Sequence, residues 1–438
     1  MPFMKRNAKL ALTLLVFSPL VYSADGDPYR AYKVLFIGIL FLVISPPKIN
    51  LLAFRIRYAT ACVLAIALLI AIQPAFVVGA ELLYNLKFTI VLLACFLPLL
   101  CLLNRSPIDA AGQVVFIDKA LCVLFGVAAL SLVLSSVTGL GEIYSEGRQF
   151  QQRSFAWLGD SFSPVMVFFL FYFFFRRSFI GVLISVVCLI GIMQAKMAIG
   201  MVAFGCLIYI LIFGKQASRI FVMAAGALTL FFLPEILGIV AGHIFNFEYS
   251  LNNRLLSFDS GLLFFESSPW FGVGANQTFT LLSGDFDIST LDRYESGILY
   301  YDFFQIHNSF IRILAELGFI GFSFFAIFCL TIIRQSYSIL KFWHGIQQNH
   351  SRALLLACAL WLISFIVFNQ TVGWFEPGHP QLSWFVCFLT LMNFVHKSGR
   401  DCILNSSSLR DKRDFSNQKN FMNIRHITSS RRHRECGI

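Results

Sequence analysis

The residues with the clearest capacity for chemistry are one histidine and three cations. His307 opens the segment HNSFIRILAELGFIGF, and a neutral imidazole can take a proton from a hydroxyl nucleophile at about pH 7. Arg153 and Arg254 lie upstream, where a guanidinium group can form forked hydrogen bonds to phosphate oxygens. Lys196 offers a point charge. Gathered on one face, these groups suit a polyanion such as a lipid diphosphate.

Each of these residues also has a simpler structural interpretation. The three cations could extend to lipid headgroups, and the histidine could cap a helix. Arg312 and Glu316 lie four residues apart, which is typical of an intrahelical ion pair. Gly318 and Gly321 are typical of close helix packing. Both interpretations stay open at this level.

The elements that carry these residues are predicted to be membrane helices. Of 438 residues, 58% are hydrophobic and 13% are charged, whereas soluble proteins are about 45–50% apolar and about 25% charged. The polar side chains are too few to cover soluble domains, and the chain is too apolar to be disordered. The predicted fold class is therefore all-α, a polytopic bundle of about 12 transmembrane helices. The predicted spans are 8–23, 31–46, 58–80, 87–103, 119–138, 160–175, 178–195, 197–213, 219–241, 308–333, 353–372 and 381–396.

The charge distribution predicts how this bundle is oriented. The formal net charge is +11, and the basic residues concentrate in every second connection and after the last span. Short basic loops stay in the cytoplasm, so both termini are expected to be cytoplasmic. Residues 1–23 are either an uncleaved first helix or a cleaved signal peptide. None of the 11 cysteines falls in a predicted outer loop, and no Cys or His spacing indicates a metal site.

The longest connection, 242–307, is predicted to be a partly helical lid on the outer face. Its residues 251–266 fit an amphipathic helix that lies along the membrane surface or roofs a cavity. A Ser-Pro pair ends that helix, and Gly272 and Gly274 predict a tight turn. A long structured loop on one face is a usual place for function.

Residues 1–396 form the predicted membrane bundle, including this loop, and residues 397–438 form a basic tail. The tail is expected to be a disordered, solvated topology anchor, with contact to anionic lipid as the alternative. Nucleic acid is not expected as a partner, because no folded nucleic-acid module accompanies the charge. No dinucleotide loop or P-loop occurs in a suitable context. The sequence therefore predicts neither a bound cofactor nor nucleotide-driven chemistry.

The region 140–335 resembles the O-antigen ligase and O-antigen polymerase-like membrane glycosyltransferases. The similarity rests on PWFGVGANQTF and, after a loop, IHNSFIRILAELGFIGF. The family shows a Pro-x-x-Gly-x-Gly turn, then His-Asn before a helix with a Glu-x-Gly-x-x-Gly-like pattern. Arg254 precedes the turn and Arg153 precedes a polar turn and a span, as in the family. The matching motif positions are Pro269, Gly272, Gly274, His307, Asn308, Glu316, Gly318 and Gly321.

The chain departs from the family pattern in two places. Many members have Ser-Arg where this chain has Ala195-Lys196, so the forked phosphate contact is lost there. After Arg153 the chain reads AWLGDSFSP instead of the common version that ends in Pro-Asn. Asp160 in this segment is an alternative contributor to an acceptor site.

The resemblance implies an active site at the periplasmic face of the bacterial inner membrane. In this family an acceptor hydroxyl attacks the anomeric carbon of a glycan carried on undecaprenyl diphosphate, and no metal ion is thought to be needed. His307 would orient or deprotonate the acceptor, while Arg254 and Arg153 would bind the diphosphate, with Lys196 as a further cation. The supporting residues would be Asn308, Arg312, Glu316, Gly272 and Gly274.

Polymerisation of a cell-surface polysaccharide is the favoured function. Ligation of a finished glycan to lipid A-core is the alternative within the family, and protein-directed oligosaccharide transfer is a weaker third. A lipid or polysaccharide transporter or flippase is the alternative from another class; the long outer loop and the lack of an internal repeat argue against it. The expected partners are an undecaprenyl diphosphate-linked oligosaccharide, an acceptor glycan or lipid A-core, membrane lipids and a chain-length regulator.

Overall fold

The part of the chain that the computed structural model describes is almost entirely helical. Within that part no strand occurs, which confirms the all-α class. The predicted tail, except for its first residue, falls beyond this part. The described residues are 2–22, 30–45, 57–77, 82–103, 110–138, 162–192, 196–221, 223, 247–275, 277–278, 306, 308–344, 350–368 and 381–397.

The helices follow the predicted spans closely. Each span overlaps a helix; of the span 219–241 only residues 219–221 and 223 are described, and they are helical. The helices are α1 (Pro2–Tyr22), α2 (Arg30–Ile44), α3 (Arg57–Ile72), η1 (Gln73–Ala75), α4 (Leu82–Leu103), α5 (Ala110–Thr138), α6 (Ser163–Arg176), α7 (Phe179–Val186), the π-helical η3 (Val187–Ile192), α8 (Lys196–Phe213), a short helical segment at 216–221, α11 (Phe247–Ser267), α13 (Ser309–His344), α14 (His350–Phe368) and a last helix at 381–397.

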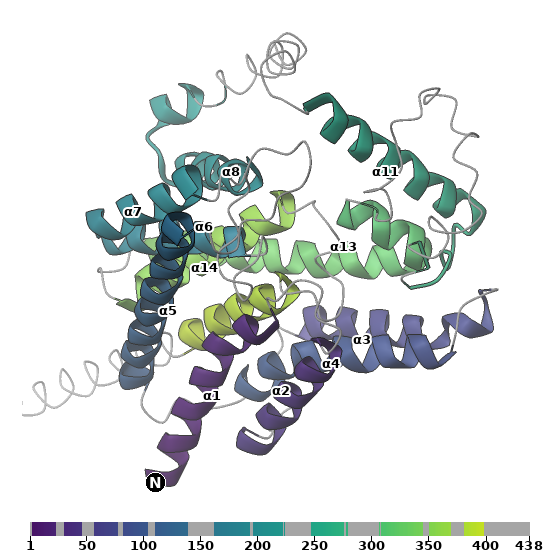
Figure 1. The fold of residues 1–438 in the computed structure, drawn as a ribbon, viewed down its shortest axis with the longest axis horizontal. Helices are drawn as coiled ribbons and strands as arrows, with labels where there is room; N and C mark the ends of the chain where they lie inside the picture. The colour runs from purple at the N-terminus through teal and green to yellow at the C-terminus, as the bar shows by residue number, and fades with distance from the viewer. Residues whose placement is uncertain are drawn as a thin grey trace, which may run out of the picture.

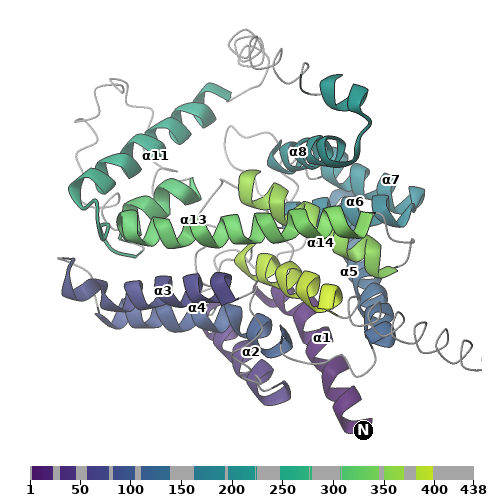
Figure 2. The same cartoon turned by 180° about the vertical axis from the view of Figure 1, so that it is seen from behind.

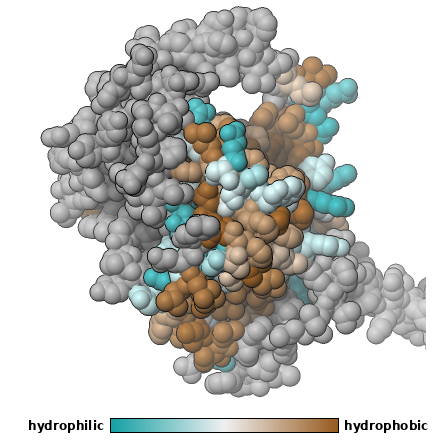
Figure 3. All heavy atoms as spheres, turned by 90° about the vertical axis from the view of Figure 1, so that its right-hand side faces the viewer, coloured by the Kyte–Doolittle hydropathy of each residue, from teal (hydrophilic) through white to brown (hydrophobic). Residues whose placement is uncertain are grey.

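The described helices are those of a membrane protein. Among the described residues, four segments are long and apolar enough to cross a bilayer, namely Tyr58–Ala75, Leu82–Leu102, Gly112–Leu134 and Ser309–Trp343. Several shorter helices are also apolar. Large side chains such as Leu83 and Phe179 are exposed, and the described surface in Figure 3 is largely hydrophobic. The bundle of about 12 transmembrane helices stays a prediction.

Helix α13 lies at the centre of the part that positions the candidate site. It packs against α3 on one side and α11 on the other, an arrangement visible in both Figure 1 and Figure 2. Helix α14 packs against α13, α6 and α8. The interior is rich in fully buried aromatic side chains, including Trp343, Trp361 and Tyr172.

The connection between α6 and α7 shows how the sequence sets a tight reversal. Arg177 adopts a left-handed conformation, with φ of 60°, at the end of α6. Ser178 then caps α7, because its hydroxyl accepts a hydrogen bond from the Gly181 N–H at 3.3 Å. The reversal falls between the predicted spans 160–175 and 178–195.

A charged cluster joins α5 to α6. The Arg176 guanidinium lies 3.3 Å from a carboxylate oxygen of Asp118, and the Tyr172 hydroxyl donates to the same carboxylate. Arg176 also donates to the Cys122 sulfur at 3.0 Å. The carboxylate, which is buried, is thereby paired, as a charge in an apolar environment must be.

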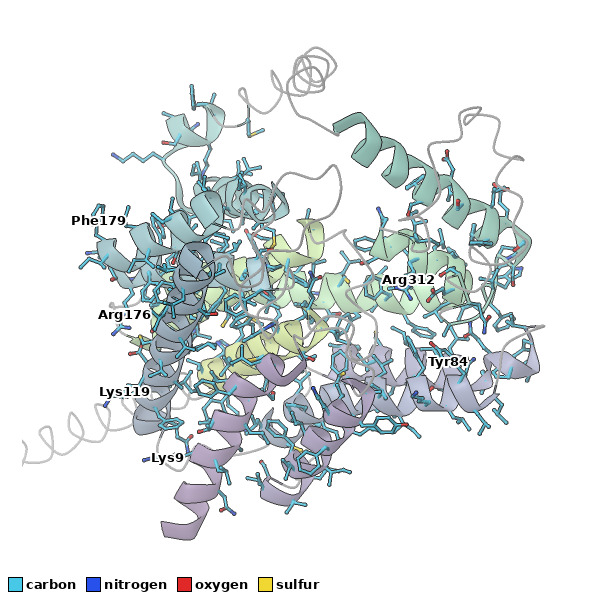
Figure 4. All side chains as sticks on the ribbon, viewed as in Figure 1. Lys9, Tyr84, Lys119, Arg176, Phe179 and Arg312 are labelled. Carbon is cyan, nitrogen blue, oxygen red and sulfur yellow. The ribbon has the colours of Figure 1, made fainter. Side chains whose placement is uncertain are left out.

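Residues predicted to lie on opposite sides of the membrane are separated in the fold. Figure 4 shows Lys9, Lys119 and Arg176 toward one side of the view, whereas Arg312 and Tyr84 lie toward the other. The first three were predicted to face the cytoplasm. Arg312 was predicted to lie near the outer face.

Candidate functional site

The site begins with the turn that follows α11. Helix α11 ends at Ser267, and Pro269 cannot continue it because proline lacks a backbone N–H. The Gly272 N–H donates to the Ser268 carbonyl at 2.9 Å. Gly272 and Gly274 have φ angles of 71° and 110°, which favour glycine. Both the predicted helix and the predicted tight turn are therefore confirmed.

This turn inserts into a break in α13. Gly318 has φ 64° and ψ −169° inside the helix, so the carbonyls before it lose their donors four residues later. The turn replaces those donors. The Val273 N–H donates to the Ala315 carbonyl at 2.9 Å, and the Gly274 N–H donates to the Glu316 carbonyl at 3.1 Å.

The N–H groups after the break are satisfied in the same way. The Phe319 N–H donates to the Pro269 carbonyl at 2.8 Å. The Ile320 N–H donates to the Trp270 carbonyl at 3.3 Å. The turn therefore replaces the 319-to-315 and 320-to-316 backbone bonds of a continuous helix, which explains why α13 can be interrupted here.

The backbone of the turn and the backbone of α13 approach so closely that no side chain fits between them. A Cβ on Gly272 would lie 2.3 Å from the Glu316 carbonyl carbon. A Cβ on Gly318 would lie 2.4 Å from the Trp270 carbonyl carbon. Gly321 lies one turn further on, where a Cβ would lie 3.0 Å from Leu69 of α3. The predicted close helix packing is confirmed at Gly321, whereas at Gly318 the close neighbour is the turn.

Glu316 connects this junction to its surroundings through its side chain. Its Oε1 accepts from Arg312 Nε at 2.9 Å, which confirms the intrahelical ion pair. The same oxygen accepts from the Thr278 hydroxyl at 2.6 Å. Arg312 and Glu316 are each only 6% exposed. Thr278 was not singled out from the sequence, where a threonine after a turn carries no distinctive signal.

Gln73 is the second residue that sequence reasoning missed. Its Nε2 donates to the Phe271 and Glu316 carbonyls, each at 2.8 Å. Its Oε1 accepts from the Ala275 N–H at 3.0 Å. The side chain is fully buried and sits in η1, where Pro74 follows the end of α3. A glutamine before a proline is unremarkable in sequence, so only the fold reveals this role.

Asn308 sets the start of α13. Its side-chain oxygen accepts from the Phe310 N–H at 3.0 Å and from the Ile311 N–H at 3.1 Å, which is the geometry of a helix N-cap. His307 itself lies outside the described residues, although both of its chain neighbours are described. Its predicted role therefore stays a prediction.

Position 254 on α11 is in helical register with the residues of that helix that pack against α13. Ser257 and Phe264 on this face are buried, and a Cβ on Gly261 would lie 2.3 Å from Ile311. Position 254 precedes Gly261 by seven residues, which is almost two helical turns. The two positions therefore differ by only about 20° around the helix axis. The helix register thus continues this face to Arg254, whose side chain is not among those described. Ile306, which precedes His307, also borders Gly261.

The other two predicted cations are not brought to this junction by the described residues. Lys196 is the first residue of α8, a helix that packs against α14 and α6, and its side chain is outside the described set. Arg153 also falls outside it. Of the predicted residues, the structure joins Gly272, Gly274, Arg312 and Glu316 at the junction, with Asn308 at the start of the same helix.

A comparison with protein families supports the resemblance found in this region. Residues 165–326 match the model of a protein family described as O-antigen ligase. The match runs from α6 to beyond the break in α13 and lies within the region 140–335 that carried the resemblance. No curated protein matched the chain. The match includes the turn, Arg254 and His307, but neither Arg153 nor Gln73.

Proposed function

We propose, starting from the O-antigen ligase family match of residues 165–326, that this membrane protein transfers a glycan from a lipid diphosphate carrier to an acceptor hydroxyl. The family match supports a glycosyltransferase-type enzyme. The finer proposal is that the donor is an undecaprenyl diphosphate-linked repeat unit and that the product is a cell-surface polysaccharide. Transfer is expected to need neither a nucleotide nor a metal ion.

His307 is the proposed catalytic residue. The acceptor hydroxyl oxygen forms a bond to the anomeric carbon of the donor sugar, and His307 takes the hydroxyl proton. The bond from that carbon to the diphosphate breaks, and the diphosphate leaves with the electron pair. Arg254 binds the departing diphosphate, with Arg153 and Lys196 as further cations, because charge that develops on a leaving group is stabilised by preplaced cations.

The packing of α11 against the start of α13 is the observation that carries this proposal. The Asn308 cap fixes where α13 begins, directly after His307. Gly261 packs against Ile306 and Ile311, and the same face of α11 continues to Arg254. Arg254 is thus on a helix that contacts Ile306 and Ile311, described residues on either side of position 307, although the two proposed site residues are 53 positions apart in the chain.

The proposed location is the periplasmic side of the bacterial inner membrane, with both termini in the cytoplasm. The separation of Lys9, Lys119 and Arg176 from Arg312 in Figure 4 supports this orientation. Short basic segments are retained in the cytoplasm, which leaves the turn and the start of α13 on the outer side. There the loop 242–307 would act as a lid.

Polymerisation is the favoured product-forming reaction, and ligation to lipid A-core is the second candidate, which the description of the matching family favours. A strain that lacks this protein distinguishes them. Accumulation of single repeat units on the lipid carrier or on the acceptor is the result expected for a polymerase. Long chains that stay on the lipid carrier would contradict polymerisation and indicate a ligase.

A transporter or flippase is tested in the same strain. Loss of a flippase leaves the donor on the cytoplasmic side, so lipid-linked repeats would be inaccessible to a periplasmic glycosidase. The proposed transferase predicts that the accumulated donor is accessible to that glycosidase. Protected donor would contradict a transferase.

A further inference from the structure

We infer that Gln73 is a positioning residue for the proposed transfer, acting from outside the region that matches the family. The inference rests on the proposed function. Gln73 belongs to η1 at the end of α3, far before residue 165, where the family match begins. Its side chain nevertheless contacts both backbone segments that meet at the break in α13, namely the turn after α11 and α13 itself.

Both the nitrogen and the oxygen of the Gln73 side-chain amide form hydrogen bonds at this junction. Its Nε2 bridges the Phe271 carbonyl of the turn and the Glu316 carbonyl of α13, at 2.8 Å each. Its Oε1 receives the Ala275 N–H at 3.0 Å. An amide of this length and polarity is required, because a carboxylate cannot donate and an apolar side chain can neither donate nor accept.

The Glu316 carbonyl is held by two donors. One is Gln73 Nε2 and the other is the Gly274 N–H at 3.1 Å. The Glu316 carboxylate is held in turn by Arg312 Nε and the Thr278 hydroxyl, at 2.9 Å and 2.6 Å. Loss of Gln73 therefore releases a residue on which the turn, the helix break and the ion pair all depend.

An aromatic contact also joins the end of α3 to the turn, at the surface of the protein. The Phe76 ring, three residues after Gln73, stacks on Phe271 with centroids 5.0 Å apart and an interplanar angle of 9°. Phe76 is 60% exposed whereas Gln73 is fully buried. The end of α3 thus contacts the turn with an apolar ring outside and an amide inside.

The consequence for catalysis follows from the position of α13. Glu316 lies two turns after Asn308, whose cap fixes the start of the helix next to His307. A displacement of about 1 Å in a reacting group can reduce a rate by about 100-fold. Gln73 therefore sets the placement of the helix start relative to α11, and its loss should reduce kcat more than the affinity for donor.

The test uses the full-length protein in lipid nanodiscs with a lipid-linked glycan donor. Gln73→Leu removes all three hydrogen bonds at similar volume, and Gln73→Asn shortens the amide. Gln113→Leu is the first control, because the side-chain oxygen of this buried glutamine has no hydrogen-bond partner among the described residues. Thr89→Val is the second, because it removes a side-chain hydrogen bond to the Ala67 carbonyl of α3, six positions before Gln73.

The expected result is a fall in kcat of about 10-fold to 100-fold for both Gln73 variants, with donor KM within about threefold and normal abundance. Amide exchange at Gly274 and Ala275 should accelerate in both, whereas the two control variants should match wild type in kcat and in exchange. Unchanged kcat or unchanged exchange in Gln73→Leu would overturn the inference. Failure of both Gln73 variants to accumulate would also overturn it, because Gln73 would then serve folding.

Results that contradict the proposed function differ from results that contradict only the role of Gln73. A well-folded wild-type protein that transfers no glycan from any lipid-linked donor would contradict the function itself, and with it the catalytic part of this inference. Amide exchange then decides alone whether Gln73 holds the turn on α13. Wild-type transfer with equal activity in Gln73→Leu contradicts only the role of Gln73.

Discussion

The Nε2 atom of Gln73 lies 2.8 Å from the backbone carbonyl oxygen of Glu316, a residue 243 positions later in the chain. This hydrogen bond joins the end of α3 to the break in α13. The turn after α11 meets the same carbonyl through the Gly274 N–H. Three elements that are remote in sequence are thus fixed at one atom of α13, the helix that begins two residues after the proposed catalytic histidine.

Replacement of Gly318 by alanine should destabilise the protein. Its φ of 64° and ψ of −169° fall in a region used almost only by glycine, at a cost of about 1–3 kcal/mol for other residues. The added Cβ would also lie 2.4 Å from the Trp270 carbonyl carbon. We expect a loss of at least about 2 kcal/mol in unfolding free energy, measured by thermal unfolding in detergent.

Gly126→Ala is the matched control for that experiment. A Cβ at Gly126 has no neighbour within 4 Å, and the residue lies inside α5, where alanine favours helix by about 1 kcal/mol over glycine. Its melting temperature should be unchanged or slightly higher. Equal melting temperatures for Gly318→Ala and wild type would contradict the inserted turn.

Removal of the Glu316 carboxylate should act mainly on stability. Glu316→Ala leaves Arg312 buried without the carboxylate that its Nε contacts at 2.9 Å, and breaking a buried pair in this way costs about 3–5 kcal/mol. The double variant Arg312→Met, Glu316→Leu should be less destabilised, because no uncompensated charge stays buried. Glu266→Ala, at an exposed position of α11, should change stability by less than about 0.5 kcal/mol.

Glu316→Ala is also tested against a second outcome, in which abundance and stability are normal but glycan transfer is lost. That outcome would place the carboxylate among the groups that contact substrate. Unfolding temperature and glycan transfer, measured on the same preparations, separate these outcomes.

Asn308 should be replaceable only by residues that cap a helix. Asn308→Ala removes the acceptor for the Phe310 and Ile311 N–H groups and should cost about 1 kcal/mol. Asn308→Asp should retain the cap and therefore most of the stability. Melting temperatures of the two variants check this, and an alanine variant as stable as the aspartate variant would be inconsistent with the cap.

Arg254 should not tolerate replacement by lysine if it binds the diphosphate. A lysine keeps the charge but cannot reproduce the fork of a guanidinium group, so Arg254→Lys and Arg254→Ala should both transfer poorly at normal abundance. Arg334→Lys, at an exposed position near the other end of α13, is the control and should keep wild-type activity. Initial transfer rates test this, and full activity in Arg254→Lys would show that only charge is needed.

Much of this site could be predicted because its signals are local. The helix 251–266, the turn at Gly272 and Gly274 and the Arg312–Glu316 pair depend on neighbours a few residues away. The composition and the spacing of apolar runs likewise predicted most helices, because a bilayer selects length and hydrophobicity directly.

The remaining features depend on partners far away in the chain. Gln73 contacts residues 198, 202 and 243 positions later, and no local pattern marks such a glutamine. The sequence indicated close packing at Gly318 but not a break in the helix, because the broken bonds are replaced by another element. A propensity for helix alone predicts continuity there.

Transfer by the purified protein, compared with His307→Ala, tests the central claim most directly. His344→Ala, at the last residue of α13, serves as the control, and the donor is a lipid-linked repeat unit without added nucleotide or divalent metal. We predict transfer by wild type and by the control, and a fall of about 100-fold to 10,000-fold in kcat for His307→Ala. Full transfer by His307→Ala would contradict the proposed site.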